Sequence, residues 1–395
     1  MTLFSPDELE YLRAETPGTR QVIHLNHAGA SLLSQPVRDT VVQYLDAEML
    51  YGGYEVRARY DADYQAIYQH IANLIRCTPA EIALTESASH AWSLAFASLD
   101  FQPGDVILTA RAEYVSNYMT LLRAVRKYGV EIQFIPPDET GQIDLEALAR
   151  MLTPRVKLLA LTHVPTSSGL VQPAAAAGQL ARAAGVTYLL DACQSVGQLD
   201  VDVSALGCDI LTATGRKFLR APRGTGFLFV RQDFMERTDP PFPDGWSALW
   251  QGTGTYAHVP GAQRFEAFES SVASRMGLGA AVQHATTLGT HRIQAQIYAV
   301  AHRLRQQLRD ITGITVHDPG AETCGIVTFT VGSHPAAAVQ QYLGARRINV
   351  SVVFGRNALL DLEHRQLTEL VRASVHYITT DSETDALCES LAALV

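Results

Sequence analysis

The sequence predicts an α/β fold with a mainly parallel sheet. Short apolar runs rich in β-branched residues alternate with longer amphipathic patterns through residues 22–231, and strands that alternate with helices form βαβ units. The run Leu158–Leu161 is apolar without a break, as expected of a strand that helices cover on both faces. With 395 residues, 47% of them hydrophobic and 18% charged, the chain can form two domains with sizeable cores.

Each element follows from a local pattern. Ser5, Pro6 and Glu8 are typical of a capped helix at the start of the chain. Beyond it, apolar runs predict strands at Val22–Asn26, Glu81–Thr85, Val106–Ala110, Ile132–Pro136, Val156–Val164, Thr187–Cys193, Ile210–Thr214 and Gly226–Arg231. Between these strands, helical spacing of apolar residues predicts helices within Tyr60–Arg76, His90–Leu99, Val115–Tyr128 and Pro173–Ala184.

The pattern changes in the segment 236–262. Proline and glycine gather there, and we expect a long loop. The segments that follow predict a second, smaller α/β domain: a long helical pattern at Gly277–Thr312, strands at Ile326–Val331 and Asn349–Val353, and a closing helix near Ser382–Leu394.

Charge and cysteine usage exclude several classes of protein. The formal net charge of −9 argues against a nucleic-acid or membrane-surface partner, since both need a basic face. The five cysteines are widely spaced and show no metal-ligand spacing, so we expect reduced thiols, no metal site and a cytoplasmic protein. No apolar run approaches the ~20 residues that span a bilayer, and the acidic start does not resemble a secretory signal.

One lysine lies where a lysine is unusual. The chain has three, Lys127, Lys157 and Lys217, and Lys217 closely follows the apolar strand Ile210–Thr214. An ammonium group at the end of a core strand is costly unless it is paired or chemically used. Lysines with a lowered pKa in such places form Schiff bases, although a plain ion pair is the commoner case.

A carboxylate ends the preceding strand. Asp191 follows the apolar run Val186–Leu190, and neighbouring parallel strands bring their carboxyl ends to one edge of the sheet, where ligands of α/β proteins bind. Pyridoxal 5′-phosphate (PLP) needs an acid beside its ring nitrogen and a lysine at C4′. A buried Asp–Lys salt bridge is the alternative. Ser87–Ser89, small residues that open a helix after a strand, add a candidate phosphate site, or a plain helix cap.

Two segments resemble a known family. Asp191–Gly197 and Thr214–Gly226 are similar to the cofactor motifs of the class V aminotransferase and cysteine desulfurase family, which belongs to the fold-type I PLP enzymes. The resemblance extends from about Leu25 to the C-terminus. It implies a large PLP-binding domain with a mainly parallel seven-stranded sheet at 17–265, a small domain from 1–16 and 266–395, and a homodimer with shared active sites.

The resemblance also implies roles for single residues. Lys217 would hold PLP as a Schiff base and act as the catalytic base, Asp191 would pair with the ring nitrogen, and Gln194 with the phenolic oxygen. Other positions match residues that hold the phosphate or contact the ring: Ala88, Ser89, Thr214 and Arg216 for the phosphate, Tyr114 and Thr166 for the ring. Arg372 matches the arginine that binds the substrate carboxylate, and Ala28 and Gly29 match a loop that lines the substrate pocket.

The reaction is predicted from what the chain lacks. Desulfurases of the family carry a loop cysteine shortly before the carboxylate arginine, and the corresponding stretch 352–360 contains none. We therefore expect a C–S β-lyase that cleaves an S-substituted cysteine or its sulfoxide to a thiol or sulfenate, pyruvate and ammonia, and not a persulfide-forming cysteine desulfurase. The missing loop cysteine, the pair Glu113–Tyr114, the segment Tyr51–Tyr54 and residues 215–224 together most resemble the branch of ergothioneine-pathway C–S lyases. An aminotransferase is the second candidate, and an epimerase is the third. A non-catalytic binding module is disfavoured, because both Lys217 and Asp191 are present.

Overall fold

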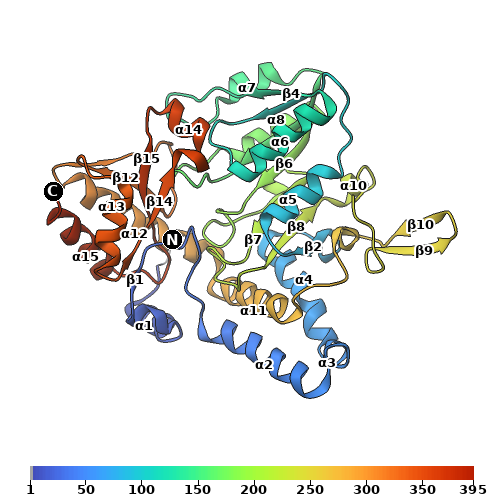
Figure 1. The fold of residues 1–395 in the computed structure, drawn as a ribbon, viewed down its shortest axis with the longest axis horizontal. Helices are drawn as coiled ribbons and strands as arrows, with labels where there is room; N and C mark the ends of the chain where they lie inside the picture. Colours follow the sequence, from blue (N-terminus) through green and yellow to red (C-terminus); the bar gives the residue numbers. More distant parts are fainter. Residues whose placement is uncertain (1–2) are drawn as a thin grey trace.

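The computed structural model describes residues 3–395 and contains two main sheets (Figure 1). The larger sheet has seven strands in the order β2 (Ile82–Thr85), β8 (Gly226–Val230), β7 (Ile210–Thr214), β6 (Thr187–Asp191), β5 (Val156–Thr162), β3 (Val106–Thr109) and β4 (Glu131–Phe134). The strands from β7 to β4 run parallel, and β8 is antiparallel to both of its neighbours. The prediction of a mainly parallel seven-stranded sheet is confirmed.

Helices cover both faces of this sheet because successive strand residues point to opposite sides. Ile107, Leu158 and Leu189 pack with α5 (Ala88–Ala97) and α6 (Val115–Tyr128). Their chain neighbours belong to a second, larger core on the other face. The helices that contribute to that core include α4 (Asp61–Ile75), α8 (Ala174–Ala183) and α11 (Val272–Leu288).

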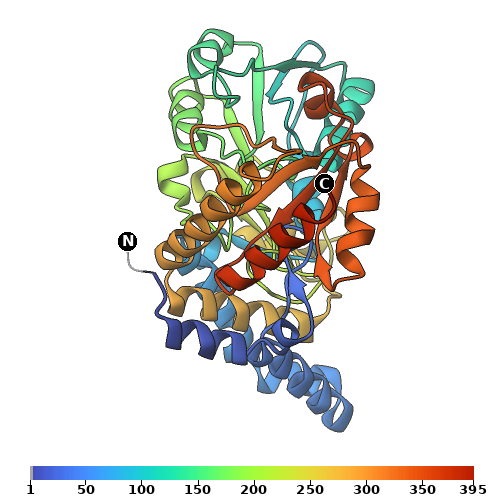
Figure 2. The same cartoon turned by 90° about the vertical axis from the view of Figure 1, so that its left-hand side faces the viewer.

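A four-stranded antiparallel sheet forms in the C-terminal part of the chain. Its order is β11 (Ile314–Val316), β12 (Ile326–Val331), β15 (Glu369–Ser374) and β14 (Ser351–Phe354). Near the N-terminus, β1 (Ile23–His24) pairs with β13 (Ile348–Asn349) and so joins this region. Figures 1 and 2 show these orange and red elements gathered on one side of the larger sheet. The division into 17–265 against 1–16 with 266–395 stays a prediction.

The remaining helices include three in predicted segments, at Pro6–Ala14, Thr290–Arg309 and Asp381–Ala392, and others that the sequence patterns did not predict. The first, α1 (Pro6–Ala14), has the expected capping box between Ser5 and Glu8. Bounds of the others are α2 (Gln35–Tyr51), α3 (Gly53–Arg59), α7 (Leu145–Met151), α9 (Val203–Leu206), α10 (Gln232–Met235), α12 (Thr290–Arg309), α13 (Ala336–Gly344), α14 (Leu359–His364) and α15 (Asp381–Ala392). Within residues 3–395, every helix is too short or too polar to cross a lipid bilayer.

Two local predictions are wrong. The expected loop at 236–262 contains a hairpin of β9 (Ala248–Gly252) and β10 (Thr255–His258), which extends away from the body of the molecule (Figure 1). The single helical pattern at Gly277–Thr312 is two helices, because the chain turns at Gly289, whose φ of +86° favours glycine.

Candidate active site

The site forms where neighbouring parallel strands end. Asp191 is the last residue of β6, and its register partner on β7 is Thr212. Lys217 comes soon after the end of β7 at Thr214. The prediction that Asp191 and Lys217 meet at one sheet edge is confirmed, since both line one pocket.

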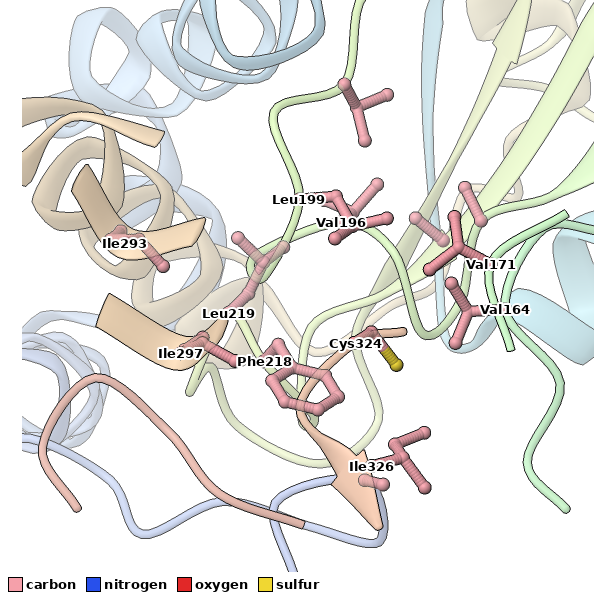
Figure 3. Close-up of a cluster of buried hydrophobic side chains, with 14 of the residues drawn as sticks. Val164, Val171, Val196, Leu199, Phe218, Leu219, Ile293, Ile297, Cys324 and Ile326 are labelled. Carbon is pink, nitrogen blue, oxygen red and sulfur yellow. The ribbon is translucent and has the colours of Figure 1, made fainter. Parts of the chain in front are cut away.

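The turn after Asp191 packs directly against the backbone that carries Lys217. A methyl group at Gly197 would lie 2.4 Å from the carbonyl carbon of Phe218, and Gly197 has a φ of +94°. Glycine is therefore required there for both reasons. The same loops contribute side chains to a buried cluster with α12 and the start of β12 (Figure 3). This packing holds the two reactive groups on a rigid base.

The pocket at this edge of the sheet is lined by thirteen residues. All nine residues predicted to bind the cofactor line it: Ala88, Ser89, Tyr114, Thr166, Asp191, Gln194, Thr214, Arg216 and Lys217. Ser87, Thr162, Val164 and Cys193 complete the lining. The structure thus brings the predicted residues together, and their individual roles stay predictions.

Asp191 is buried in the lining of the pocket. Its carboxylate accepts hydrogen bonds from Asn117 Nδ2 at 2.7 Å and from the backbone N–H of Cys193 at 2.8 Å. Burial raises the pKa of this carboxyl group, and both hydrogen bonds and the charge of Lys217 oppose the rise. The two N–H donors leave acceptor capacity for a protonated ring nitrogen.

Lys217 is also buried. Burial is the largest cause that lowers the pKa of its ammonium group, and the positive charges of Arg216 and Arg372 lower the pKa further, whereas Cys193 and Asp191 raise it. A lowered pKa increases the share of neutral amine, which is the nucleophile for Schiff-base formation. Its Nζ atom lies 6.0 Å from the centre of the Tyr114 ring, so the base and the predicted stacking residue face the same space.

The predicted substrate residues line a second chamber that adjoins Lys217. Its lining includes Ala28, Gly29 and Arg372. Arg372 donates to Thr166, including its backbone oxygen at 3.2 Å, and to Asn26 Oδ1 at 3.3 Å. Burial and the charge of Arg216 lower its pKa to about 10. A buried guanidinium repelled by a second one favours an anion between or beside them.

The part of the pocket beside the start of α5 suits a phosphate. Ser87 caps α5 by accepting from the N–H of His90 at 3.1 Å. The N–H groups of Ala88 and Ser89 come first in that helix and have no acceptor within it. Together with the guanidinium of Arg216, which also donates to the backbone oxygen of Gly29, they form an anion site.

Sequence reasoning missed a polar network behind the pocket. Glu113 lies between β3 and α6 and is buried. It accepts from Thr109 at 3.2 Å and from Asn117 at 3.0 Å, and Asn117 in turn donates to Asp191. The sequence patterns assigned Glu113 no role, because local spacing shows nothing of a contact with another strand.

The donor set fits PLP. Asp191 can face the ring nitrogen, Lys217 can bond C4′, and the N-terminus of α5 can hold the phosphate. Gln194 supplies an independent observation: its Nε2 donates to the Ala28 oxygen at 3.2 Å, but its buried Oε1 has no partner among residues 3–395. A buried polar atom of this kind is normally satisfied, and a group bound in the pocket can satisfy it.

Comparisons with known proteins agree with this geometry. The family model "Aminotransferase class-V" matches residues 23–387. The chain belongs to this family. A protein of Methanothermobacter thermautotrophicus, described as a probable cysteine desulfurase, is 28% identical over 97% of this chain and 97% of its own length. A cysteine desulfurase of Yersinia pestis is 30% identical over the same shares of both chains.

A solved structure shows the same architecture. The apo cysteine desulfurase of Thermococcus onnurineus matches with a TM-score of 0.92 and 25% identity, covering 100% of this chain and 99% of the other. The fold is therefore that of the fold-type I PLP enzymes, and the chain is a PLP-dependent enzyme.

These findings correct the predicted reaction. The C–S β-lyase prediction excluded cysteine desulfurases because residues 352–360 lack a cysteine. That exclusion is wrong, since relatives along nearly the whole chain are named cysteine desulfurases. The absence of a cysteine from residues 352–360 means only that no thiol in this segment accepts the sulfur. It does not exclude desulfuration.

Proposed function

We propose that this enzyme removes sulfur from L-cysteine. The observation that carries the proposal is the placement of Lys217 and Asp191 in the cofactor pocket and of Arg372 in the adjoining chamber, which Lys217 also lines. The full-length similarity to proteins named cysteine desulfurase supports L-cysteine as the substrate. The balanced reaction converts L-cysteine and an acceptor thiol, R–SH, to L-alanine and the persulfide R–S–SH.

Each residue has a defined task in this reaction. When bound, PLP supplies an electron sink for the pair released at the substrate's α-carbon. Arg372 binds the α-carboxylate, because a buried guanidinium forms strong charge-assisted hydrogen bonds. Lys217 removes the α-proton and later returns a proton as L-alanine forms. Asp191 keeps the ring nitrogen protonated. The acceptor takes the sulfur atom, and the β-carbon keeps the electron pair of the broken C–S bond and gains a proton.

The test measures products with the purified, PLP-loaded enzyme, L-cysteine and a dithiol reductant. We expect L-alanine and sulfide in equal amounts, and we expect Lys217→Ala to abolish both. Lys157→Ala is the matched control, since Lys157 is exposed on β5, and it should leave the rate unchanged.

Two other outcomes would refute desulfuration. Pyruvate and ammonia in place of L-alanine would show β-elimination. This is the main reaction to distinguish from desulfuration, because residues 215–224 resemble those of C–S lyases. Conversion of the cofactor to its pyridoxamine form would show transamination. Substrates in the panel should include S-alkyl cysteines and cystine beside L-cysteine.

We also propose that the enzyme is a cytoplasmic homodimer. Large apolar side chains are exposed on α2, α3 and the β9–β10 hairpin, including Met49 at 76%, Tyr54 at 76% and Trp250 at 84% exposure. Exposed apolar side chains of this size favour burial against a partner. The five free cysteines support a reducing compartment. Light scattering on the purified protein should give twice the mass of the chain, and a monomer would contradict the proposal.

A further inference from the structure

Glu113 is a buried acid for which the proposed reaction has no task. Four donors surround it: the Thr109 hydroxyl at 3.2 Å, the Tyr114 backbone N–H at 2.7 Å, Asn117 Nδ2 at 3.0 Å and the Thr162 hydroxyl. Four donors on two oxygens suit the ionised form, which accepts only. The hydrogen-bond donors around Glu113 therefore favour a negatively charged carboxylate, although the side chain is buried.

The environment of Glu113 is balanced between its two protonation states. Burial raises its pKa to about 7, with the negative charge of Asp191 acting in the same direction, while the bonds from Thr162, Asn117 and the Tyr114 N–H oppose the rise. The charged group that faces it is Asp191 on β6. The elements β3 and β5 present the neutral hydroxyls of Thr109 and Thr162, and α6 presents the neutral amide of Asn117.

Glu113 contacts both sides of the cofactor site through neighbours. Asn117 Nδ2 donates to Glu113 at 3.0 Å and to Asp191 Oδ2 at 2.7 Å, so one amide joins the two acids. On the other side, Glu113 accepts from the backbone N–H of Tyr114, whose ring lines the pocket. Asp191, which is predicted to face the cofactor's ring nitrogen, and Tyr114, whose ring faces Lys217, are therefore both linked to the buried carboxylate of Glu113.

We propose that Glu113 is a positioning residue that, through Asn117, holds the Asp191 carboxylate against the cofactor's ring nitrogen, and that a proton gained by Glu113 weakens this hold. The negative charge of Glu113 adds to that of Asp191 and so stabilises positive charge on the bound cofactor. When Glu113 is neutral, this contribution is lost and Asn117 loses its charged acceptor. The inference concerns the cofactor and does not depend on which amino acid is the substrate.

The experiment is a pH titration of the visible absorption band of PLP bound to Lys217, without substrate, together with the Kd for PLP. We expect Glu113→Gln to lower the apparent pKa of the band by at least about 0.5 unit, because a nearby negative charge that favours the protonated form is gone. The Kd for PLP should rise. Glu139→Gln, an exposed site, is the control and should change neither.

A double-mutant comparison separates positioning from a merely structural role. Asn117→Ala removes the amide that joins the two acids, so Glu113→Gln made in that background should shift the band less than it does alone. Equal shifts in both backgrounds would overturn the relay through Asn117. A shift below about 0.2 unit for Glu113→Gln alone would overturn any influence of Glu113 on the cofactor.

A milder variant keeps the proposal testable if Glu113→Gln does not fold. Thr109→Val removes one donor to Glu113, and the hydroxyl of Thr109 has no bond to Asp191. Loss of that donor disfavours the ionised acid, so the Glu113-dependent change in the titration should move to higher pH. An unchanged titration curve for Thr109→Val would count against the proposal.

Discussion

Two buried histidines should make this protein sensitive to mild acid. His27 and His376 are stacked with ring centres 4.6 Å apart, and both are at most 1% exposed. Burial lowers the pKa of both rings well below the usual 6.5, and the positive charge of Arg220 and repulsion from His24 add to this. His376 Nε2 also lies 3.0 Å from the backbone oxygen of Phe218, which places the pair directly behind the Lys217 loop.

The sign and the size of the effect follow from linkage. The folded state holds these rings neutral, whereas the unfolded chain binds a proton at each near pH 6.5. Stability is therefore complete above pH 6.5 and falls as the pH drops toward the lowered folded pKa. Between pH 7 and pH 5.5, each histidine should lower the free energy of unfolding by about 1.2 kcal/mol, or about 2.5 kcal/mol for the pair.

The assay is urea denaturation at several pH values for the wild-type protein and for His376→Gln. The variant keeps a side-chain hydrogen-bond donor and cannot titrate, so its free energy of unfolding should fall by about 1.2 kcal/mol less than the wild type over this range. A difference in the free energy of unfolding that is the same at every pH is irrelevant, because the test compares how steeply this free energy changes with pH in the two proteins. His334→Gln, at an exposed site, should keep the wild-type slope. Identical slopes for wild type and His376→Gln would refute the reasoning.

Three further predictions follow from single contacts. Arg372→Gln should raise KM for L-cysteine by roughly 100-fold with a smaller effect on kcat, because a charged hydrogen bond contributes about 1.5–3 kcal/mol; an unchanged KM in initial-rate assays would remove Arg372 from the carboxylate site. Gly197→Ala should lower Tm and weaken PLP binding by its backbone clash, whereas Gly185→Ala, with a similar φ of +67° but open space, should show only the backbone strain of about 1 kcal/mol. Arg305→Met should destabilise the fold by about 3–5 kcal/mol, since it leaves Asp318 buried without its 2.8 Å partner, and adding Asp318→Asn, which removes the charge but keeps an oxygen that accepts from Gly169 and Thr328, should recover most of the loss.

The last two predictions have clear contrary results. Equal effects of the two glycine substitutions on Tm would show that the clash behind Lys217 is relieved by small movements. A double variant at 305 and 318 that is no more stable than Arg305→Met would show that lost packing, and not the unpaired charge, dominates. Both are measured by thermal and urea denaturation of the purified proteins.

Much of the fold was predictable because its signals are local. The strands alternate with helices at spacings that a window of ten residues shows, and Asp191 and Lys217 stand at strand ends where parallel neighbours must meet. The hairpin at 248–258 and the break at Gly289 were missed. The two short strands of the hairpin were missed because turn residues dominate the composition of that segment. The break at Gly289 was missed because the helical spacing of apolar residues continues across the glycine.

The sequence by itself determined the fold class, the cofactor and the positions of the residues that line its pocket. It could not determine the reaction, because the absence of a cysteine from residues 352–360 leaves other routes for sulfur open. Only the tertiary structure joined Glu113 to Asp191 through Asn117 and stacked His27 on His376. The reason is physical: burial, charge and hydrogen bonding arise between segments far apart in the chain, so the resulting pKa shifts exist only once those segments are packed together.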